Sequence, residues 1–373
     1  MNKNVKKIVT GILSLLLLFL CAGEKRAAAE TGTQDEAVSA DESPLFIITV
    51  EGKSGFIDKT GTVVITPQFD DAWVFTEGLA AVRTGDDETS MWGYIDKTGN
   101  IVINQQFDSP GYFSEGFARV RIGNDETGKW GYIDKTGNIV IEPQFDEACE
   151  FSEDLALVRI GDKETGKWGY IDKTGTLIIN PQFDFALNFS EGLASTLIGD
   201  LETSKWGFID KTGKYAINPQ FDLAYDFSEG LARIRIIDGK TSKWGYIDKT
   251  GTAVINPQFD WCEDFSESLA LVRIEGKYGY IDREGKMVIY PQFNTAENFS
   301  DGLAGVMVGN MMTGRWGFID RTGKLVIRPQ FDYAYNFSNG LAFAGIGGFG
   351  FFKENGESGY IDKTGNFIWG PFY

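Results

Sequence analysis

The sequence contains no histidine, and it has only three cysteines in 373 residues. Without histidine, a Ser-His-Asp or Cys-His catalytic set cannot form, and the commonest zinc ligand is missing. The sequence also lacks the Gly-x-x-x-x-Gly-Lys loop that cradles nucleotide phosphates. These absences exclude several large classes of hydrolase and nucleotide-binding protein, and they predict a protein that is not an enzyme.

Positive charge is also scarce. The 35 lysines and arginines are outnumbered by 53 aspartates and glutamates, which gives a formal net charge of −18. The first 29 residues hold five basic residues against one acidic residue, so the rest of the chain carries −22. A field of this sign repels phosphate backbones and anionic lipids. We therefore expect binding neither to nucleic acid nor to a membrane surface.

The N-terminus is typical of a secretory signal peptide over residues 1–29. It has a basic start, an apolar run from Ile8 to Ala22 and a triplet of small residues that ends at Ala29. The apolar run is too short to span a bilayer comfortably, so the mature chain is expected to have no transmembrane segment. Lipidation of Cys21 is the alternative, but Leu20 before it is larger than the small residue that such a site uses. The protein is thus expected to be exported, whether secreted, periplasmic or at the cell surface.

The remaining chain divides into a short linker and a long array. Residues 30–43 are acidic and rich in small residues, which is typical of a disordered linker. From residue 44 to 373 one unit recurs nine times, each copy having a glycine followed by Tyr or Phe, then Ile, then Asp. The nine glycines are Gly55, Gly93, Gly131, Gly169, Gly207, Gly245, Gly279, Gly317 and Gly359. Successive glycines lie 38 residues apart, except for one step of 34 and one of 42, and such a period indicates a repeat architecture.

Each unit of about 38 residues reads as a β-meander of at least three strands. In the copy from 145 to 182, short β-branched and aromatic runs cover 155–160, 167–172 and 176–179, with Gly, Asp, Asn and Pro between them. Changes in repeat length fall between the first two of these runs, which marks that connection as an exposed hairpin tip. The segment from Phe145 to Phe151 is either a fourth strand or a single helical turn.

Two turns recur in the unit. In Asp172-Lys173-Thr174-Gly175, the aspartate can accept hydrogen bonds from the backbone and the glycine can take a positive φ, which predicts a type I turn followed by a glycine bulge. The Ser-Glu-Gly segment at 190–192 predicts a second turn of similar kind. Asp154 and Ser268 replace the glycine of this second turn, and we expect a strain of about 1 kcal/mol at each.

The segment from Lys129 to Gly137, together with Phe151-Ser152-Glu153 and Leu155-Ala156, resembles the bacterial WG-repeat (KWG repeat) proteins. The resemblance covers the chain from Pro44 to its end. It implies an exported protein whose copy number varies between relatives, and it brings no catalytic residues.

Units of this kind cannot bury their apolar faces alone, so they stack on their neighbours. The predicted fold is all-β, with tandem meanders stacked as an open twisted solenoid. A closed β-propeller with eight or nine blades is the alternative. The variable copy number that the resemblance implies favours the open form.

Tryptophan precedes the recurring glycine in six copies, and serine or tyrosine replaces it in three. The six are Trp92, Trp130, Trp168, Trp206, Trp244 and Trp316. A row of indoles could bind a sugar or a quaternary ammonium ligand. Packing between units is the favoured interpretation, because Ser54 and Ser358 stand in the terminal copies, where one neighbour is missing.

The acidic loops, such as 86–88 and 162–164, could gather Ca²⁺, which takes several oxygen ligands. Solvated hairpin tips are favoured, because the equivalent loop at 309–314 has no acid. No other metal or cofactor is expected.

The sequence therefore predicts a secreted or envelope-associated, non-catalytic repeat scaffold that binds a protein or a glycan, and it does not identify the ligand. A glycan hydrolase that uses paired carboxylates is the alternative. The repeats argue against it, because every copy has the same acids in turn-forming roles. No catalytic residue is assigned.

Overall fold

The structure is a computed structural model that describes residues 44–85, 90–124, 126–201, 203–310, 313–347 and 357–372. The predicted signal peptide at 1–29, the linker at 30–43 and Cys21 lie outside the described residues. Every helix or strand assigned in the described ranges is a β-strand. Among them there is no helix of the length and apolarity needed to cross a membrane.

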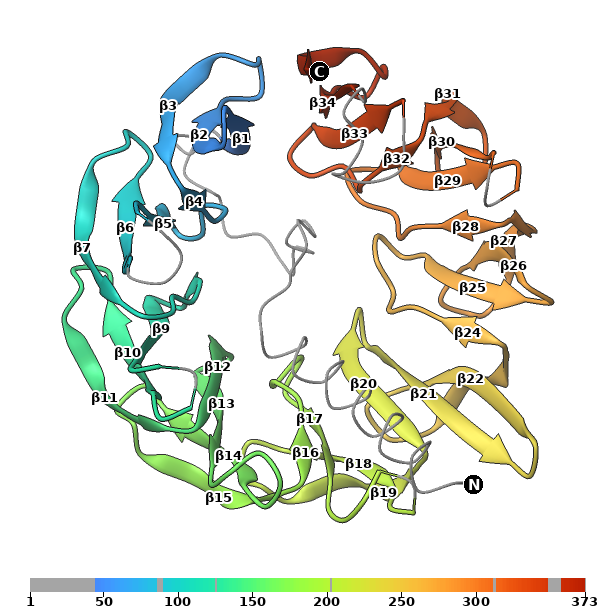
Figure 1. Ribbon diagram of the computed structural model, residues 1–373. Helices are drawn as coiled ribbons and strands as arrows, with labels where there is room; N and C mark the ends of the chain where they lie inside the picture. Colours follow the sequence, from blue (N-terminus) through green and yellow to red (C-terminus); the bar gives the residue numbers. More distant parts are fainter. Residues whose placement is uncertain are drawn as a thin grey trace. The chain divides into compact units, whose positions relative to one another are not determined.

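The chain divides into two compact units. The first contains Leu45–Ile57 and Val63–Asp226, and the second contains Asp58–Thr62 and Phe227–Tyr373. The strands form nine antiparallel sheets (Figure 1), of which the first has three strands and the others have four. Strands follow one another across each sheet in chain order or its reverse, as expected for meanders.

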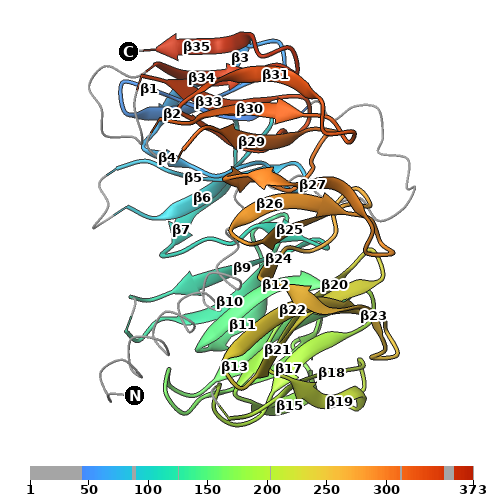
Figure 2. The same ribbon diagram turned by 90° about the vertical axis from the view of Figure 1, so that its right-hand side faces the viewer.

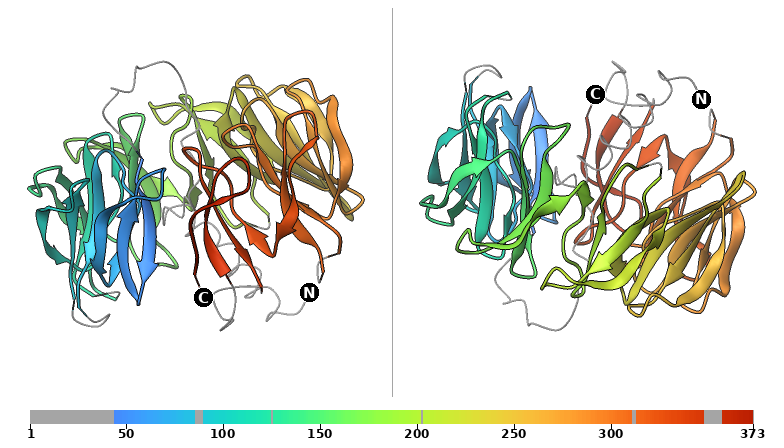
Figure 3. Two further views of the ribbon diagram at one scale, coloured as in Figure 1. Left: turned by 90° about the horizontal axis from the view of Figure 1, so that it is seen from above. Right: turned by 90° about the horizontal axis from the view of Figure 1, so that it is seen from below.

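The first unit holds five sheets, whose orders are β1-β2-β3, β4-β5-β6-β7, β11-β10-β9-β8, β12-β13-β14-β15 and β16-β17-β18-β19. Their strands are β1 (Phe46–Val50), β2 (Lys53–Ile57), β3 (Val63–Phe69), β4 (Asp71–Ala72), β5 (Leu79–Arg83), β6 (Trp92–Asp96), β7 (Ile101–Phe107), β8 (Phe113–Ser114), β9 (Phe117–Ile122), β10 (Lys129–Asp134), β11 (Ile139–Phe145), β12 (Glu147–Ser152), β13 (Leu155–Ile160), β14 (Lys167–Asp172), β15 (Leu177–Phe183), β16 (Phe185–Ala186), β17 (Ala194–Leu197), β18 (Trp206–Ile209) and β19 (Tyr215–Phe221). Figure 3 shows the blue and teal sheets of this unit stacked face to face.

The remaining four sheets are β20-β21-β22-β23, β24-β25-β26-β27, β28-β29-β30-β31 and β32-β33-β34-β35. Their strands are β20 (Leu223–Ser228), β21 (Leu231–Asp238), β22 (Thr241–Ile247), β23 (Ala253–Phe259), β24 (Trp261–Cys262), β25 (Ala270–Ile274), β26 (Lys277–Ile281), β27 (Met287–Phe293), β28 (Thr295–Ala296), β29 (Ala304–Val308), β30 (Arg315–Ile319), β31 (Leu325–Phe331), β32 (Tyr333–Ala334), β33 (Ala342–Ile346), β34 (Glu357–Ile361) and β35 (Phe367–Phe372). Figure 2 shows β29, β30 and β31 of the second unit side by side.

The segment that begins with Phe-Asp is a strand, not a helical turn. It pairs with the next strand of its sheet, as in Ala148↔Val158, and in six sheets it is only two residues long. Each complete repeat therefore supplies four strands. The last of these four, called the outer strand below, is seven residues long in eight of the nine sheets.

The glycine of the Trp-Gly pair lies directly beneath the backbone of the outer strand. A Cβ built on Gly169 would be 2.5 Å from the Ile179 carbonyl oxygen and 2.7 Å from the Pro181 nitrogen. The pairing shifts at this point, because Trp168 lies opposite Phe183 while Tyr170 lies opposite Ile179. Two residues of β14 thus match four of β15, and this bulge fits only over a residue without a side chain.

Neighbouring sheets bury each other's apolar faces. The Tyr170 hydroxyl donates a 2.7 Å hydrogen bond to the Leu187 carbonyl of the next repeat, and the Tyr170 ring lies 4.8 Å from that of Phe189. One buried cluster contains Leu155 and Tyr170 of one sheet together with Ile209 of the next. A single repeat cannot bury these apolar side chains by itself, so it requires the neighbouring sheet to cover them.

The turns also join one repeat to the next. Gly175 in the Asp-Lys-Thr-Gly turn has φ +83°, and its Cβ position lies 3.1 Å from Ile141 Cγ2 on the outer strand of the preceding repeat. Gly175 N–H donates to the Asp172 carbonyl and Asp172 N–H donates to the Thr176 carbonyl. The predicted type I turn with a glycine bulge is therefore confirmed.

The predicted open solenoid is wrong, and the nine sheets are the blades of a nine-bladed β-propeller. Inside the second unit, the turn glycine of the first repeat, Gly61, has its Cβ position 3.1 Å from Ile368 Cγ2 of β35. Later turns, such as that of Gly175 on Ile141, meet the third residue of the preceding outer strand, whereas Gly61 meets the second residue of β35. The first repeat therefore contacts the last one in a register shifted by one residue. The repeat period fits both architectures, because the rotation between sheets is set by side-chain packing that the period does not encode.

The second turn is not of the predicted kind. Glu191 and Gly192 both have positive φ, 53° and 88°, which defines a type I′ turn. A glutamate is rarely found in this conformation. The glutamate of the equivalent turn in the preceding copy, Glu153, has φ 54°, and its carboxylate reaches the next repeat. In the preceding copy Glu153 Oε2 accepts a 2.9 Å hydrogen bond from Gly192 N–H. A contact between repeats therefore compensates the backbone strain.

We predict that Gly317→Ala destabilises the protein by about 2 kcal/mol or more, because the added Cβ would lie 2.5 Å from the Ile327 carbonyl oxygen. Gly305→Ala in the same sheet is the control, since its Cβ would meet only ordinary contacts at 3.5 Å. Chemical denaturation measures both. Equal losses of unfolding free energy would contradict the close-approach explanation.

We also predict that Ser268→Gly stabilises the protein by about 1 kcal/mol, because Ser268 has φ 65° where other copies have glycine. The reverse change in the next repeat, Gly302→Ser, should destabilise by a similar amount. Nothing lies within 4 Å of the Gly302 Cβ position, so this change tests backbone conformation alone. Thermal unfolding of the two variants checks the opposite signs.

Candidate functional site

The tryptophan row is covered by protein. Trp130, Trp206, Trp244 and Trp316 are buried, and Trp92 and Trp168 are partly buried. Arginines of the preceding strand lie over several of the rings, with the Arg119 guanidinium carbon 4.6 Å from the Trp130 centroid. The indoles thus lie among neighbouring side chains and do not form an open platform on which a sugar could stack.

The aspartate that follows the recurring phenylalanine ties three segments together. Asp70 accepts hydrogen bonds from Lys53 Nζ at 2.6 Å and from Gly85 N–H at 2.8 Å. These partners come from the sheet before it and from the sheet that it enters. Asp146, Asp184 and Asp260 repeat the arrangement with their own lysine and backbone N–H.

The aspartate of the Asp-Lys-Thr-Gly turn is occupied in the same way. Asp134 Oδ1 accepts from the Thr136 hydroxyl at 2.7 Å and from the backbone N–H groups of Thr136 and Asn138. The Thr hydroxyl holds the pKa of this carboxyl below its usual value, with the backbone donors helping and burial opposing. The pKa is lowered in the same way at Asp58, Asp96, Asp172, Asp210, Asp248 and Asp320.

One acid departs from this pattern. Asp264 Oδ1 lies 2.9 Å from Arg233 Nε, and Glu263 Oε2 lies 3.0 Å from Arg233 Nη1. Desolvation raises the pKa of Asp264, while Arg233 opposes the rise. The Asp264 side chain keeps 39% of its surface exposed, which limits that desolvation. Arg119 Nε makes the equivalent contact with Glu150 Oε1 at 2.9 Å in an earlier repeat, so the Arg233–Asp264 contact is a structural ion pair between repeats that occurs more than once.

The polar hairpin tips do not form a calcium site in the described residues. Asp162 Oδ1 accepts from the backbone N–H groups of Glu164 and Thr165, and Asn310 Oδ1 makes the same cap to Thr313 N–H. An uncharged asparagine therefore accepts the same backbone hydrogen bond as the aspartate, so this position needs no negative charge. In the described parts of the chain, no three acidic or cysteine side chains are placed to hold a metal ion. Residues 86–88, which form one of the predicted acidic loops, lie outside the residues that the structure describes.

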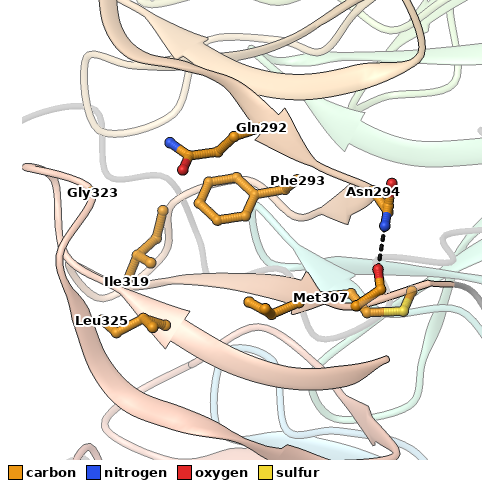
Figure 4. A pocket seen from close by; sticks show the side chains of 9 residues that line it. Gln292, Phe293, Asn294, Met307, Ile319, Gly323 and Leu325 are labelled. Atoms are coloured by element: carbon orange, nitrogen blue, oxygen red, sulfur yellow. Dashed lines mark hydrogen bonds between the residues drawn. The ribbon is translucent and has the colours of Figure 1, made fainter. Parts of the chain in front are cut away.

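A small pocket of about 270 Å³ lies in the second unit (Figure 4). Apolar side chains, among them Phe293, Met307 and Ile319, surround it, and Asn294 at its edge donates to the Gly309 carbonyl. Asn294 stands where other repeats have aspartate, and Met307 stands where several have arginine. Its volume is below the range of about 300–1,000 Å³ that is usual for small-molecule sites.

The exposed positions of the outer strands form a surface that the sequence analysis did not identify. In each of the eight seven-residue outer strands only the third and seventh residues are buried, as Ile65 and Phe69 are in β3. The first two residues are exposed aliphatics in the first four repeats, and we name this set the aliphatic stripe. It consists of Val63, Val64, Ile101, Val102, Ile139, Val140, Leu177 and Ile178. A continuous aliphatic run such as Val-Val-Ile indicates a strand but does not reveal which side chains face water.

A glutamine recurs at the sixth position of eight outer strands and is exposed in all of them. We name these residues the glutamine row: Gln68, Gln106, Gln144, Gln182, Gln220, Gln258, Gln292 and Gln330. The hydrogen bonds shown for Gln144 and Gln182 run only to carbonyls of their own strands, those of Glu142 and Asn180. Unlike the recurring aspartates, these amides have no evident part in holding the repeats together.

Comparison with known proteins agrees with the repeat pattern. A family model described as "WG containing repeat" matches eight stretches of the chain, namely residues 55–86, 92–124, 130–163, 168–201, 206–240, 244–278, 278–311 and 316–348. The ninth copy, around Gly359, is unmatched although it forms the same four-stranded sheet. No curated protein matches the chain.

Solved structures are similar in fold. The chain resembles the crystal structure of a eukaryotic initiation factor with a TM-score of 0.61 and 13% identity, over 89% of this chain and 96% of that one. It also resembles the β-propeller domain of the Trilobed protease from Pyrococcus furiosus, with a TM-score of 0.39 and 12% identity, over 70% of this chain and 98% of that one. At such identities the first similarity concerns the fold alone.

We predict that the unfolding free energy is nearly constant from neutral pH to about pH 5 and falls below about pH 4. Because the pKa values of the turn aspartates are lower in the folded state, their stabilisation is present above the unfolded value near 3.8. It is lost as the pH falls through the lowered values. Denaturant unfolding over a pH series measures this, and a loss that begins above pH 5 would contradict it.

Proposed function

Because the chain belongs to the family of proteins built from the WG-containing repeat, we propose that it is an exported, non-catalytic scaffold that binds a protein or a glycan along a repetitive face. The observation that carries the proposal is the contrast between the recurring acids and the glutamine row. The acids are occupied by hydrogen bonds within and between repeats. The glutamines recur as regularly, yet they are exposed on the outer strands.

The chemistry of the glutamine row suits an uncharged partner. Each amide offers one acceptor oxygen and two N–H donors, so it can pair with the hydroxyls of a glycan or with the backbone of a polypeptide. Successive outer strands of the first unit lie next to one another, since Gly99 contacts Ile65 and Gly137 contacts Ile103. The row therefore repeats one hydrogen-bonding group per blade. Such an arrangement favours a partner that extends over several repeats.

A catalytic function has weaker support. The turn aspartates have lowered pKa values, which is unsuited to a general acid. Asp264 is the exception, but Arg233 contacts both it and Glu263. Asp264 nevertheless provides a direct test of the hydrolase alternative.

Export is part of the proposal and rests on the sequence of residues 1–29. An acidic, repeat-built protein outside the cytoplasm would meet glycans and envelope proteins as its most abundant neighbours. The negative charge excludes neither of these, because both include uncharged and cationic surfaces. It does disfavour nucleic acid as a partner.

The test is a glycan array together with a pull-down from an envelope fraction, using the purified exported protein with and without Ca²⁺. We expect a partner whose capture is unaffected by Ca²⁺ and whose affinity falls at least tenfold when the first four glutamines are changed. This variant combines Gln68→Ala, Gln106→Ala, Gln144→Ala and Gln182→Ala. The matched control is Glu126→Ala with Lys163→Ala on exposed hairpin tips.

Two outcomes would contradict the proposal. One is a captured partner whose affinity is the same for the glutamine variant and the wild type. The other is turnover of a glycan that Asp264→Asn abolishes while the fold persists, which would favour the hydrolase alternative.

A further inference from the structure

Two arginines of the second unit lack the carboxylate partner that equivalent arginines have. Five repeats have an arginine at one position of the second strand of the sheet, namely Arg83, Arg121, Arg159, Arg235 and Arg273. Arg83 pairs with an aspartate and Arg159 with a glutamate, and each acid lies directly opposite its arginine on the first strand of the sheet. Among the described residues, Arg235 and Arg273 form no ion pair, and the Nε atom of each is buried without a hydrogen-bond partner. These two guanidinium groups therefore keep their capacity for an anion.

An aromatic residue, Trp261, takes the place of the acid opposite Arg273. On its other side Arg273 pairs with Tyr278, and the guanidinium carbon lies 5.9 Å from the centroid of that ring. Residues paired in this way across neighbouring strands share one face of the sheet, and both rings are partly exposed. Stacking on an aromatic ring orients a guanidinium group and leaves its N–H donors for a ligand.

Arg235 belongs to the same cluster of side chains. Its guanidinium carbon lies 5.7 Å from the centroid of Trp244, whose ring centroid lies 5.0 Å from that of Trp261. Contacts thus run without a break from Arg235 through the two indoles to Arg273. Arg233 also lies over both indoles, but its charge is matched by the two acids described above. We name the cluster the arginine–aromatic patch: Arg235, Trp244, Trp261, Arg273 and Tyr278.

The hairpin tip beside Arg273 is short. It consists of two residues, whereas the tip at 309–314 has six. In the longer tip, a Cβ on Gly314 would lie 2.8 Å from the sulfur of Met307, the residue that replaces the arginine. In the short tip, a Cβ on Gly276 would meet nothing within 4 Å. The short tip thus does not pack over the arginine position as the longer one does.

We propose that the arginine–aromatic patch binds a glycan that carries carboxylate groups. Carboxylates are the partners of the equivalent arginines elsewhere in the chain, and a guanidinium group binds them through paired N–H donors. The exposed parts of Trp261 and Tyr278 add apolar ring faces against which the C–H groups of a sugar pack. The combination suits a sugar acid better than an acidic peptide, whose carboxylates lie on flexible side chains without a ring.

The net charge of the chain does not exclude such a ligand. Repulsion by a chain of charge −18 acts over a distance and is screened by salt, with a Debye length of about 8 Å at physiological ionic strength. A carboxylate in contact with a guanidinium group lies well within that length. A short glycan with few charges is therefore favoured over a long polyanion.

The arginine–aromatic patch uses no residue of the glutamine row. Its side chains lie on β21, β22, β24, β25 and β26, whereas the glutamines lie on the outer strands. The inference thus goes beyond the proposed function, and either one can fail while the other holds.

The test is isothermal titration of the purified protein with a trimer of galacturonic acid, and with the methyl ester of that trimer as the uncharged probe. We expect the ester to bind about tenfold more weakly than the acid, because it offers no charge to the two guanidinium groups. Arg235→Gln with Arg273→Gln should weaken binding of the acid by about tenfold. The matched control, Arg83→Gln with Arg159→Gln, removes two arginines that already have a carboxylate partner, and it should leave the affinity unchanged.

A second variant supplies the missing acid and keeps both arginines. Trp261→Glu places a carboxylate opposite Arg273, as Glu147 lies opposite Arg159, and it should weaken binding of the acid trimer by about tenfold. Trp261→Phe keeps an aromatic ring without adding charge and should weaken binding less. Melting temperatures show whether each variant is folded, and Trp261→Glu decides if the double arginine variant is not.

Several results would overturn the proposal. One is equal affinity for the acid trimer and its methyl ester, and another is an equal loss in the patch and control arginine variants. A triglutamate peptide that binds as tightly as the trimer would overturn the assignment to a sugar acid. The variant with four glutamines changed should bind the trimer as the wild type does, and a loss of binding there would move the site to the glutamine row.

Discussion

The close approach of the outer strand to the Trp-Gly glycine is the constraint on which each blade depends. At Gly131 the Ile141 carbonyl oxygen would lie 2.4 Å from a Cβ, so only a residue without a side chain permits the bulge. The bulge in turn sets which outer-strand residues point inward. It buries Ile141 and Phe145 and turns the residues between and before them toward water. One missing side chain thus determines both the core and the exposed face of the repeat.

The same bulge also positions residues that contact the next blade. The buried isoleucine that it presents, Ile141, packs under the turn glycine of the following repeat, Gly175, so closely that a Cβ on Gly175 would lie 3.1 Å from Ile141 Cγ2. The tyrosine next to the glycine of the Trp-Gly pair reaches forward, as Tyr132 does when it donates to the Cys149 carbonyl at 2.7 Å. Each repeat therefore needs its neighbour to complete its core and its hydrogen bonds. This reciprocal dependence makes the array cooperative, since no blade buries its faces alone.

Local chemistry could be predicted from the sequence, and geometry between repeats could not. The Asp-Lys-Thr-Gly turn was predictable because the aspartate side chain and the glycine φ act within four residues. The left-handed conformation of glutamate in the second turn was missed because its carboxylate interacts with another repeat, as that of Glu153 does with Gly192 N–H, and no local rule includes such a contact. The propeller was predicted only as the alternative to a solenoid for the same reason, since the rotation from blade to blade arises from packing. The exposure of Ile101 was hidden within an aliphatic run that reads as a buried strand.

The way in which the recurring polar residues are used limits where function can lie. An aspartate that accepts hydrogen bonds from four donors, as Asp134 does, has little capacity left for a ligand. Specific recognition must then come from recurring residues that are exposed, or from positions where the repeats differ. The ion pairs Arg119–Glu150 and Arg233–Asp264 join neighbouring blades at two places, and Asn294 beside Met307 is a difference at a third. A repeat protein of this design therefore keeps its scaffold uniform while its outer strands and its exceptional residues remain free to define partners.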